Sequence, residues 1–517
     1  MISRRTFVIA GGSLTLAASL PRLRAKTRTR FDRDPFALGI ASGSPTPTGV
    51  VLWTRIAPDP LAPLGGVTQA TLAVRWEVAN DEAMRDIVQR GSVSASVDAG
   101  FSVHVEVNGL EPGRGYFYRF LAGDATSPVG RTRTAPPLDA AVERLRFAVA
   151  CCQHYEHGYF GAYNHIVADD PDLVVFLGDY IYGGKTRGDD AVRHHAGPPP
   201  KTLADYRARY ALYRTDPDLQ AAHACCPWIL TWDDHEVSNN YAGDWSPRGE
   251  SGEQFLRRRT AAYQAFYEHM PLPHVSAPSG AALRLHARYP FGNLLSFHVL
   301  DGRQYRSPPA CPESGDRLGP ACSERLNPER SYFGQAQERW LEQGLRMSRT
   351  RWNIIAQQTL FSPFDRKPGP ETRFSADGWD GYPAARDRLL EALATHRPSN
   401  PVFIGGDLHA FFVADVRRNY AKPSALLASE FVTSSISTRR RGSQRRLDKL
   451  RRENPHLLYA DGTARGYIRI EVTANELRAD LRAMSSVATR DAACDTAASY
   501  RVADGVPGPQ AVQARKQ

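Results

Sequence analysis

Four short polar segments, each directly after an apolar stretch, constrain this 517-residue chain most strongly. They read Ala-Cys-Cys-Gln (150–153), Gly-Asp-Tyr-Ile-Tyr (178–182), Trp-Asp-Asp-His-Glu (232–236) and Gly-Gly-Asp-Leu-His (405–409). Together they offer thiolate, carboxylate, phenolate and imidazole groups. Because loops at the carboxyl ends of strands in an open α/β sheet meet at one rim, we expect the four segments to form one site. This mixture of donors suits a hard trivalent iron beside a second cation that prefers oxygen ligands.

The spacing of apolar residues changes near residue 145, and this change predicts two domains. Between residues 36 and 135, short runs with strand-like alternation are separated by turn residues. The clearest runs are Val50–Thr54, Ala73–Val78, Ser102–Val107 and Tyr116–Phe120. We therefore expect an immunoglobulin-like or fibronectin-like β-sandwich over residues 30–136, followed by a linker.

From residue 145 onward, apolar strands alternate with helical patterns, which predicts a layered α/β domain over residues 145–490. The expected strands are 145–151, 173–177, 228–232, 294–300, 352–356 and 401–404. The expected helices are 159–169, 202–213, 253–268, 334–346 and 383–396. Residues 491–517 remain as a C-terminal tail. The fold class is therefore α/β, preceded by an all-β domain.

The N-terminus carries the pattern of an export signal. Ser-Arg-Arg-Thr-Phe at residues 3–7 is a twin-arginine signature, and a mild apolar run follows it to Leu20. The run is shorter than the ~20 apolar residues of a membrane span. We expect a signal peptide over residues 1–25, engagement of the twin-arginine export machinery, and a soluble periplasmic or secreted protein with no stable membrane span. A frayed basic arm is the alternative.

The chain is basic. Its formal charge is +10, and removal of the first 25 residues, which hold four arginines and no acid, leaves +6. Part of the excess is local, in Arg439, Arg440, Arg441, Arg445, Arg446, Lys449, Arg451 and Arg452. A solvated basic helix explains this cluster, and a field that steers anionic substrates is the sharper alternative. No nucleic-acid-binding module is recognisable.

Seven cysteines occur in a chain that we expect to be exported. Cys311 and Cys322 lie in a Pro/Gly-rich loop and are the best disulfide candidates. Cys225 and Cys226 precede an apolar strand and suit the core, whereas the sequence assigns no partner to Cys494. The odd number leaves at least one thiol outside any intramolecular disulfide, which suits a metal ligand.

Asp179 and Tyr182 follow an apolar strand. A carboxylate at this position can bridge two metal ions through its two oxygens, and a tyrosine phenolate forms near neutral pH on a strong Lewis acid such as ferric iron. The alternative is an aspartate in a turn beside a tyrosine packed on the sheet.

Cys152 ends the first α/β strand. Alternation along the strand sends Cys151 and Cys152 to opposite faces, so only one of them is expected in the site. We choose Cys152, which lies nearer the end of the strand and next to Gln153. A small buried core cysteine is the common alternative and describes Cys151.

The polar run 233–236 suits a second metal ion and an acid–base group. An aspartate here can bind the ion, and His235 can hydrogen-bond a phosphate oxygen or the leaving group. Asn239 and Asn240 could add oxygen ligands. A solvated acidic turn is the alternative.

Asp407 and His409 lie in a tight loop that begins with two glycines, which permit a close backbone approach. His409 offers an imidazole to the iron side of the site. Asp407 offers the hard oxygen that calcium prefers. Two adjacent cations can hydrolyse phosphate esters without a covalent nucleophile.

These motifs resemble the calcineurin-like, purple-acid-phosphatase-type metallophosphatase core, and more closely the PhoD-type alkaline phosphatases, which include a phospholipase D with the same site. The resemblance covers nearly the whole chain. It includes Gly-Ile-Ala-Ser-Gly (39–43), Leu-Trp-Thr-Arg (52–55), Cys-Gln (152–153), the run 232–242 and Gln-Gln-Thr (357–359).

The resemblance implies a two-sheet phosphatase domain with ferric iron and calcium as cofactors. Iron would take Cys152, Asp179, Tyr182 and His409. Calcium would share Asp179 and add Asp234 and Asp407, with a further ligand from Asn239, Asn240 or Gln357. The generic core has asparagine in place of Asp234 and histidine in place of Asp407, and these departures favour calcium over zinc or manganese.

We therefore expect an exported phosphoesterase that hydrolyses phosphate monoesters or diesters with a metal-activated hydroxide, and in which His235 acts on the leaving oxygen. A phospholipase D or another dedicated phosphodiesterase on the same site is the nearest alternative. A non-catalytic surface-binding protein is the alternative from another class. The substrate, the oligomeric state and the full set of calcium ligands stay open.

Overall fold

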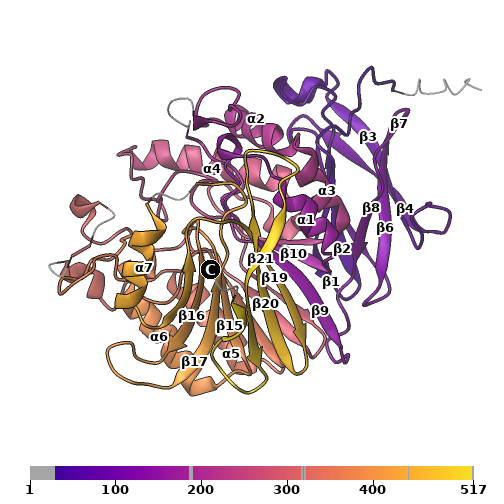
Figure 1. The fold of residues 1–517 in the computed structure, drawn as a ribbon. Coiled ribbons are helices and arrows are strands. Elements are labelled where there is room, and N and C mark those ends of the chain that lie inside the picture. Colours follow the sequence, from indigo (N-terminus) through magenta and orange to yellow (C-terminus); the bar gives the residue numbers. More distant parts are fainter. Residues whose placement is uncertain (1–28, 185–189, 316–317, 320–321, 440–441, 515–517) are drawn as a thin grey trace, which may run out of the picture.

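Two large mixed β-sheets lie face to face, with helices on their outer faces and an all-β part at one end (Figure 1). The structure is a computed structural model that describes residues 29–184, 190–315, 318–319, 322–439 and 442–514. The expected signal peptide, Arg440 and Arg441 lie outside the described residues. None of the helices within that range has the length and apolar character of a membrane span.

The first sheet has ten strands, and the chain enters and leaves it several times. Their order is β22 (Gln510–Ala514), β21 (Cys494–Ala503), β20 (Glu476–Met484), β19 (Arg465–Thr473), β9 (Arg144–Ala150), β10 (Leu173–Phe176), β11 (Trp228–Leu230), β1 (Ile40–Thr46), β2 (Gly49–Arg55) and β5 (Ser102–Asn108). At its centre, β9, β10 and β11 are parallel. Their side chains are almost all buried, as expected of strands covered on both faces.

The second sheet has seven strands. Their order is β12 (Ala287–Phe291), β13 (Leu295–Val299), β14 (Trp352–Ala356), β15 (Pro401–Gly405), β17 (Leu426–Val432), β16 (Phe411–Arg417) and β18 (Leu457–Asp461). One apolar core joins the two sheets, for example where Phe147 of β9 meets Phe297 of β13 at a ring distance of 5.0 Å. This core fixes the distance between the sheets and so the width of the rim where their strands end.

The N-terminal part is a β-sandwich that shares strands with the first sheet. A smaller sheet of β4 (Ile87–Ser96), β3 (Thr71–Ala79), β6 (Gly115–Ala122), β7 (Ala125–Thr126) and β8 (Gly130–Arg133) packs on β1, β2 and β5. β1 pairs in parallel with β11, so the sandwich continues the sheet of the α/β part. The α/β class with a preceding all-β sandwich is confirmed.

Helices cover the outer face of each sheet. On the first sheet lie α1 (Ala162–Ala168), α2 (Leu203–Arg214), α3 (Pro217–Cys225) and α4 (Gly252–His269). On the second lie α5 (Gln335–Met347), α6 (Pro383–His396) and α7 (Gln444–Glu453). Capping boxes begin α2 at Thr202 and α4 at Ser251, because each N-cap hydroxyl accepts a backbone N–H that would otherwise have no partner. Five residues of the basic cluster, Arg445, Arg446, Lys449, Arg451 and Arg452, are exposed on α7, as expected of a solvated helix.

Several elements lie outside the expectation. The segment expected as a C-terminal tail contributes β21 and β22 to the edge of the first sheet. Apolar and polar residues alternate only weakly in this segment. Its pairing with β20 is what makes it part of the sheet. The sequence analysis also missed α3, although Asp216 as N-cap and Pro217 at the first helical position are recognisable start signals. The expected disulfide between Cys311 and Cys322 is present.

Trp53 links the sandwich to the helices of the α/β part. Its ring is fully buried, its Nε1 donates to the Glu268 carbonyl oxygen at 3.0 Å, and the Arg214 guanidinium lies 3.9 Å from the ring centroid. We expect Trp53→Ala to lower the free energy of unfolding by ~3–5 kcal/mol, because it leaves a cavity at this junction. Leu138→Ala is the control, since that side chain is 65% exposed. Denaturant unfolding checks both, and equal effects would contradict the role of Trp53.

Candidate metal centre

The four polar segments meet where the strands of the two sheets end. Cys152, Asp179 and Asp234 follow the adjacent parallel strands β9, β10 and β11, and Asp407 follows β15 of the facing sheet. The first two loops are hydrogen-bonded to each other, since the Cys152 N–H donates to the Gly178 carbonyl at 3.0 Å. A side chain at Gly178 would meet the Asp233 backbone nitrogen at 2.4 Å, so only glycine lets the second and third loops approach this closely.

One group of donors lies on the side that we assigned to iron. The ligand atoms of Cys152, Asp179 and His409 all lie within 4.8 Å of one another. Tyr182 joins them, because its hydroxyl donates to Asp179 Oδ2 at 2.6 Å and lies 3.3 Å from His409 Nε2. The structure thus brings together all four residues of the expected iron set.

A second group shares Asp179. The ligand atoms of Asp179, Asp234 and His235 also lie within 4.8 Å of one another. Asp407 faces this group from the other sheet, and its Oδ2 accepts a hydrogen bond from Thr359 Oγ1 at 2.7 Å. The two groups overlap at one carboxylate, which is the arrangement that two neighbouring cations need.

Four of the six expected ligands have backbone angles in the left-handed region. The φ angles are 57° at Cys152, 59° at Asp179, 62° at Asp407 and 52° at His409. A residue with a side chain rarely adopts this conformation, which costs ~1–3 kcal/mol at each position. Such strain concentrates at functional sites, and here it turns four side chains from three loops toward one point.

The carboxylates of the site are buried close to one another. Burial, and then the charges of Asp234 and Asp233, hold the pKa of Asp179 well above its usual range. Burial and Asp377 raise the pKa of Asp407 to about 6. Burial opposes ionisation of Asp234 too, but the Arg303 guanidinium, His235 and the hydrogen bond from the Asn240 N–H together outweigh it and hold the pKa of Asp234 below its ordinary value.

Arg303 is the cation that the sequence analysis missed. Its Nε donates to Asp233 Oδ1 at 2.5 Å, and its two terminal nitrogens donate to Asp377 at 2.6 and 2.9 Å. Asp234 Oδ2 lies 3.7 Å from its Nη2. Arg303 is fully buried and orients the loop that holds Asp234. Arg303 lies four residues after the end of β13. Its position after an apolar strand was the sequence signal that could have identified it as a site residue.

Glu236 holds the backbone of the site. Its carboxylate accepts N–H hydrogen bonds from Asp179 at 3.1 Å, from Asp233 at 2.9 Å and from Tyr180. Burial raises its pKa to about 7. Glu236 therefore joins the loops after β10 and β11 and is a positioning residue rather than a ligand.

Aromatic rings form a row beside the donors. The His157 ring stacks on His154 at 3.8 Å, His154 lies 4.6 Å from Tyr182, and Tyr182 lies 4.2 Å from His235. The sequence analysis missed His154 and His157, although they follow directly after the Cys152 segment. The Tyr182 ring thus contacts the rings of both His154 and His235. Burial lowers the pKa of His235, so its imidazole is neutral near pH 7.

Asn239, Asn240 and Gln357 were considered for a further calcium ligand, and the structure sets Gln357 apart from the two asparagines. The Gln357 side-chain oxygen accepts hydrogen bonds from the Thr359 N–H at 3.1 Å and from Trp379 Nε1 at 3.2 Å, so this amide holds its own loop. The Asn240 N–H donates to Asp234 Oδ2 at 2.6 Å, which places Asn240 beside the expected ligand. Asn239 lies next to it in the chain.

These residues fit a pair of cations. Burial and neighbouring acids raise the pKa of the Cys152 thiol and of the Tyr182 phenol, and burial keeps the His409 imidazole neutral. Positive charge at the centre would favour the ionised thiol, phenol and carboxyl groups and use the free lone pair of the imidazole. The donor set combines oxygen, nitrogen and sulfur, as expected of a trivalent iron next to a cation that prefers oxygen.

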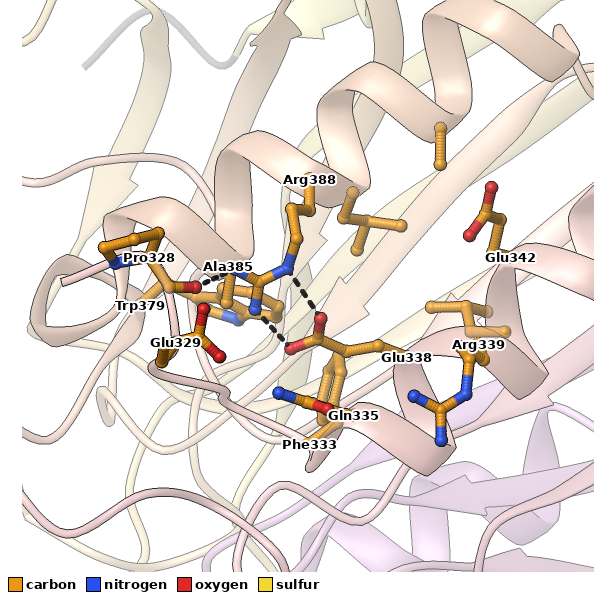
Figure 2. A pocket seen from close by; sticks show the side chains of 13 residues that line it. Pro328, Glu329, Phe333, Gln335, Glu338, Arg339, Glu342, Trp379, Ala385 and Arg388 are labelled. Atoms are coloured by element: carbon orange, nitrogen blue, oxygen red, sulfur yellow. Dashed lines mark hydrogen bonds and ion pairs between the residues drawn. The ribbon is translucent and has the colours of Figure 1, made fainter. Parts of the chain in front are cut away.

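A separate cleft of about 300 Å³ lies between α5 and α6 on the outer face of the second sheet (Figure 2). Its floor includes Phe333, Trp379 and Ala385, and Arg388 crosses it to the Glu338 carboxylate at 2.8 and 2.9 Å. None of the expected ligands lines it, so it is not part of the metal centre.

Comparison with known proteins identifies relatives over nearly the whole chain. The PhoD-like phosphatase profile matches residues 147–481, and the profile of the PhoD-like phosphatase N-terminal domain matches residues 22–136. Alkaline phosphatase D of Bacillus subtilis (strain 168) is 43% identical over 514 residues, which cover 96% of this chain and 87% of that protein. The solved structure of PhoD has a TM-score of 0.91 and 42% identity over 94% of both chains.

The two adjacent cysteines allow a sharp test of the assignment. We expect Cys152→Ala to lose one metal equivalent, because its thiol belongs to the donor group. Cys151→Ala is the matched control, since the Cys151 sulfur contacts the core near Gly406 and the Ser434 carbonyl. Elemental analysis of the purified variants measures the metal content. Metal loss in Cys151→Ala alone would show that the wrong cysteine was assigned.

Proposed function

This chain belongs to the PhoD-like phosphatase family and is a metal-dependent phosphoric ester hydrolase, and we propose that it works through an iron–calcium centre held by the residues described above. The observation that carries the proposal is the pair of donor groups that overlap at Asp179. The family membership and the 43% sequence identity with alkaline phosphatase D argue against the alternative of a non-catalytic surface-binding protein.

Iron would be held by Cys152, Asp179, Tyr182 and His409. Calcium would share Asp179 and add Asp234 and Asp407, with Asn240 or Asn239 as a further oxygen donor. Support for calcium comes from the oxygen donors of Asp179, Asp234, Asp407 and the neighbouring asparagines, because calcium takes six to eight oxygen ligands. The His235 imidazole, which also lies in the second group, is assigned to the substrate instead. The left-handed backbone at Asp179 and Asp407 supports this assignment, because it turns both carboxylates toward the other donors.

The bound cations would supply Lewis-acid polarisation of the phosphate and activation of water. The protein supplies orientation and proton transfer. His235 is 22% exposed at its side chain and lies 4.0 Å from Asp234 through Nε2, so it can reach a substrate oxygen from the rim. Its neutral imidazole can donate a hydrogen bond to the leaving oxygen. Arg303 stays engaged with aspartates and holds Asp234 in place.

The substrate class is the phosphate ester, and both monoesters and diesters fit this chemistry. A dedicated phosphodiesterase or phospholipase D would use the same donors. The side chains around the rim, rather than the metal ligands, decide between these substrates. Kinetic comparison of a chromogenic monoester with the corresponding diester tests which class is hydrolysed faster.

Export by the twin-arginine pathway is a further part of the proposal, supported by the Arg4–Arg5 pair ahead of an apolar run. This pathway carries folded proteins and so permits insertion of the metals before export. We expect the double variant Arg4→Lys, Arg5→Lys to accumulate as uncleaved precursor in the cytoplasm. Immunoblots of cell fractions measure the distribution. Normal export of the double variant would assign the chain to another pathway.

Removal of calcium tests the two-metal assignment. We expect a calcium chelator to abolish hydrolysis of a chromogenic phosphate ester while the visible ferric–tyrosinate absorption band remains, because Cys152, Tyr182 and His409 keep the iron. Added calcium should restore turnover. Asp407→Asn should weaken calcium binding and lower the rate sharply, since it removes a charged oxygen ligand. Activity that is indifferent to the chelator would contradict the assignment.

A further inference from the structure

Two adjacent cysteines outside the metal centre have their sulfur atoms in contact. Cys225 ends α3, and Cys226 follows it as the C-cap residue. Their Sγ atoms lie 3.6 Å apart, and neither cysteine belongs to a disulfide. The sequence analysis assigned both to the core, but only Cys226 is buried, and Cys225 is partly exposed. A reagent in solvent therefore meets Cys225 first.

The β-sandwich holds the end of α3 that carries this pair. Arg131 of β8 donates through Nε to the Cys225 carbonyl at 2.8 Å and through Nη2 to Asp170 Oδ1 at 2.5 Å. The Cys225 thiol also donates to the Ala222 carbonyl at 3.2 Å, one helical turn earlier. These hydrogen bonds keep the Arg131 guanidinium beside Cys225.

The two thiols differ in acidity. The contact between the two sulfur atoms lowers the pKa of Cys225 against the effect of burial, and the Arg131 guanidinium lowers it further, while Asp170 opposes this. Burial, and then the neighbouring Cys225, raise the pKa of Cys226 well above its usual range. The thiolate is the reactive form in thiol–disulfide exchange. Cys225 is therefore suited to attack first, and Cys226 to react in a second step.

The pair lies at the end of the sheet opposite to the metal centre. Cys226 and Pro227 lead into β11, whereas Asp234 follows the other end of that strand. Cys152 follows β9, which runs in the same direction as β11 through the pairing of both with β10. The pair therefore takes no part in the proposed iron and calcium sites.

Cys494 is the other partly exposed free cysteine among the residues that the structure describes. It begins β21, and four strands separate β21 from β11 in the first sheet. Burial raises the pKa of Cys494 to about 11, so little of its thiolate is present near neutral pH. This residue provides a comparison for the reactivity of Cys225.

We propose that Cys225 and Cys226 form a modification site, at which a small-molecule disulfide oxidises them to a disulfide between adjacent residues. The Cys225 thiolate attacks one sulfur of the reagent, which releases a thiolate and leaves a mixed disulfide on Cys225. The released thiolate takes the proton of Cys226. The Cys226 sulfur then attacks the Cys225 sulfur and expels the second thiolate, which takes up the proton that Cys225 had lost. Two protein thiols are thus oxidised, and the reagent is reduced to two thiols.

Geometry makes this modification reversible. The Cα atoms of adjacent residues are about 3.8 Å apart, which is closer than the ~4.4–6.8 Å usual for a disulfide. A disulfide between adjacent cysteines is therefore strained, and a strained disulfide is reduced more easily. The inference goes beyond the proposed function and does not depend on it, because neither cysteine belongs to the metal centre.

Peptide mapping of the metal-loaded protein tests the proposal. After equilibration with an excess of oxidised glutathione, the remaining thiols are alkylated and the protein is digested. We expect the peptide that contains Cys225 and Cys226 to have lost two hydrogens and to carry no alkyl group, and dithiothreitol to restore both thiols. Cys494 should be recovered in alkylated form.

Single variants then separate the two steps. We expect Cys226→Ala to accumulate a stable glutathione adduct on Cys225, because the second thiol is missing. Cys225→Ala should form no adduct on Cys226, since that thiol is buried. Cys494→Ala is the control and should form the same disulfide as the unmodified chain. Alanine is small and apolar, as a core cysteine is, and thermal unfolding verifies that each variant is folded.

Several outcomes would overturn the proposal. One is that both thiols remain free in excess oxidised glutathione. Another is that the unmodified chain keeps a stable glutathione adduct on Cys225, which would show that Cys226 does not complete the second step. A disulfide from Cys225 to a different cysteine would also refute the site. Because mapping of the unmodified chain decides each of these, the test stands even if a variant fails to fold.

Discussion

The crowding of buried carboxylates at one rim is the constraint on which the rest of the structure depends. Asp179, Asp233, Asp234 and Asp407 are brought together there, and Arg303 is the guanidinium bonded into the cluster. Like charges out of water repel strongly, so this arrangement is stable only with added positive charge or added protons. The raised pKa values of Asp179 and Asp407 reflect this repulsion, and bound cations would relieve it. A need for metal ions at this rim would thus follow from charge alone, before any ligand geometry is considered.

The two-sheet architecture makes such crowding possible. Three adjacent parallel strands deliver three loops to one edge, and the facing sheet delivers the fourth. Because one apolar core fills the space between the sheets, the loops cannot spread apart to relieve the repulsion. The left-handed backbone at four ligands is stabilised in the same way, by elements that pack well outside the site. The apolar packing of the sheets therefore offsets the backbone strain in the loops at the rim. Functional loops on a rigid scaffold commonly show this division.

Local signals predicted much of this fold and of the site. The strands β9, β10, β14 and β15 are mainly apolar runs, interrupted by Arg146 in β9 and by Asn353 in β14. The donors stand directly after three of them, so strand and proposed ligand could be recognised together. Contacts between segments far apart in the sequence could not be predicted in this way. Nothing near Arg303 in the chain reveals that Asp233 and Asp377 converge on it, and the parallel pairing of β1 with β11 joins segments almost two hundred residues apart. Such pairings depend on the packing of the whole sheet, which local composition does not encode.

The proposed metal ligands and the surrounding rim differ in how much change they tolerate. The proposed ligands are buried, hydrogen-bonded to neighbouring loops and mostly restricted in backbone conformation, so they tolerate little change. The segment around Thr438 contacts the Cys152 loop through backbone N–H groups and through the hydroxyls of Ser437 and Thr438. The Arg439 guanidinium instead donates to the Asp190 carbonyl, so this side chain can vary without disturbing those contacts. Substrate choice in this protein is best sought in those side chains, because the chemistry at the centre is common to every phosphate ester that reaches it.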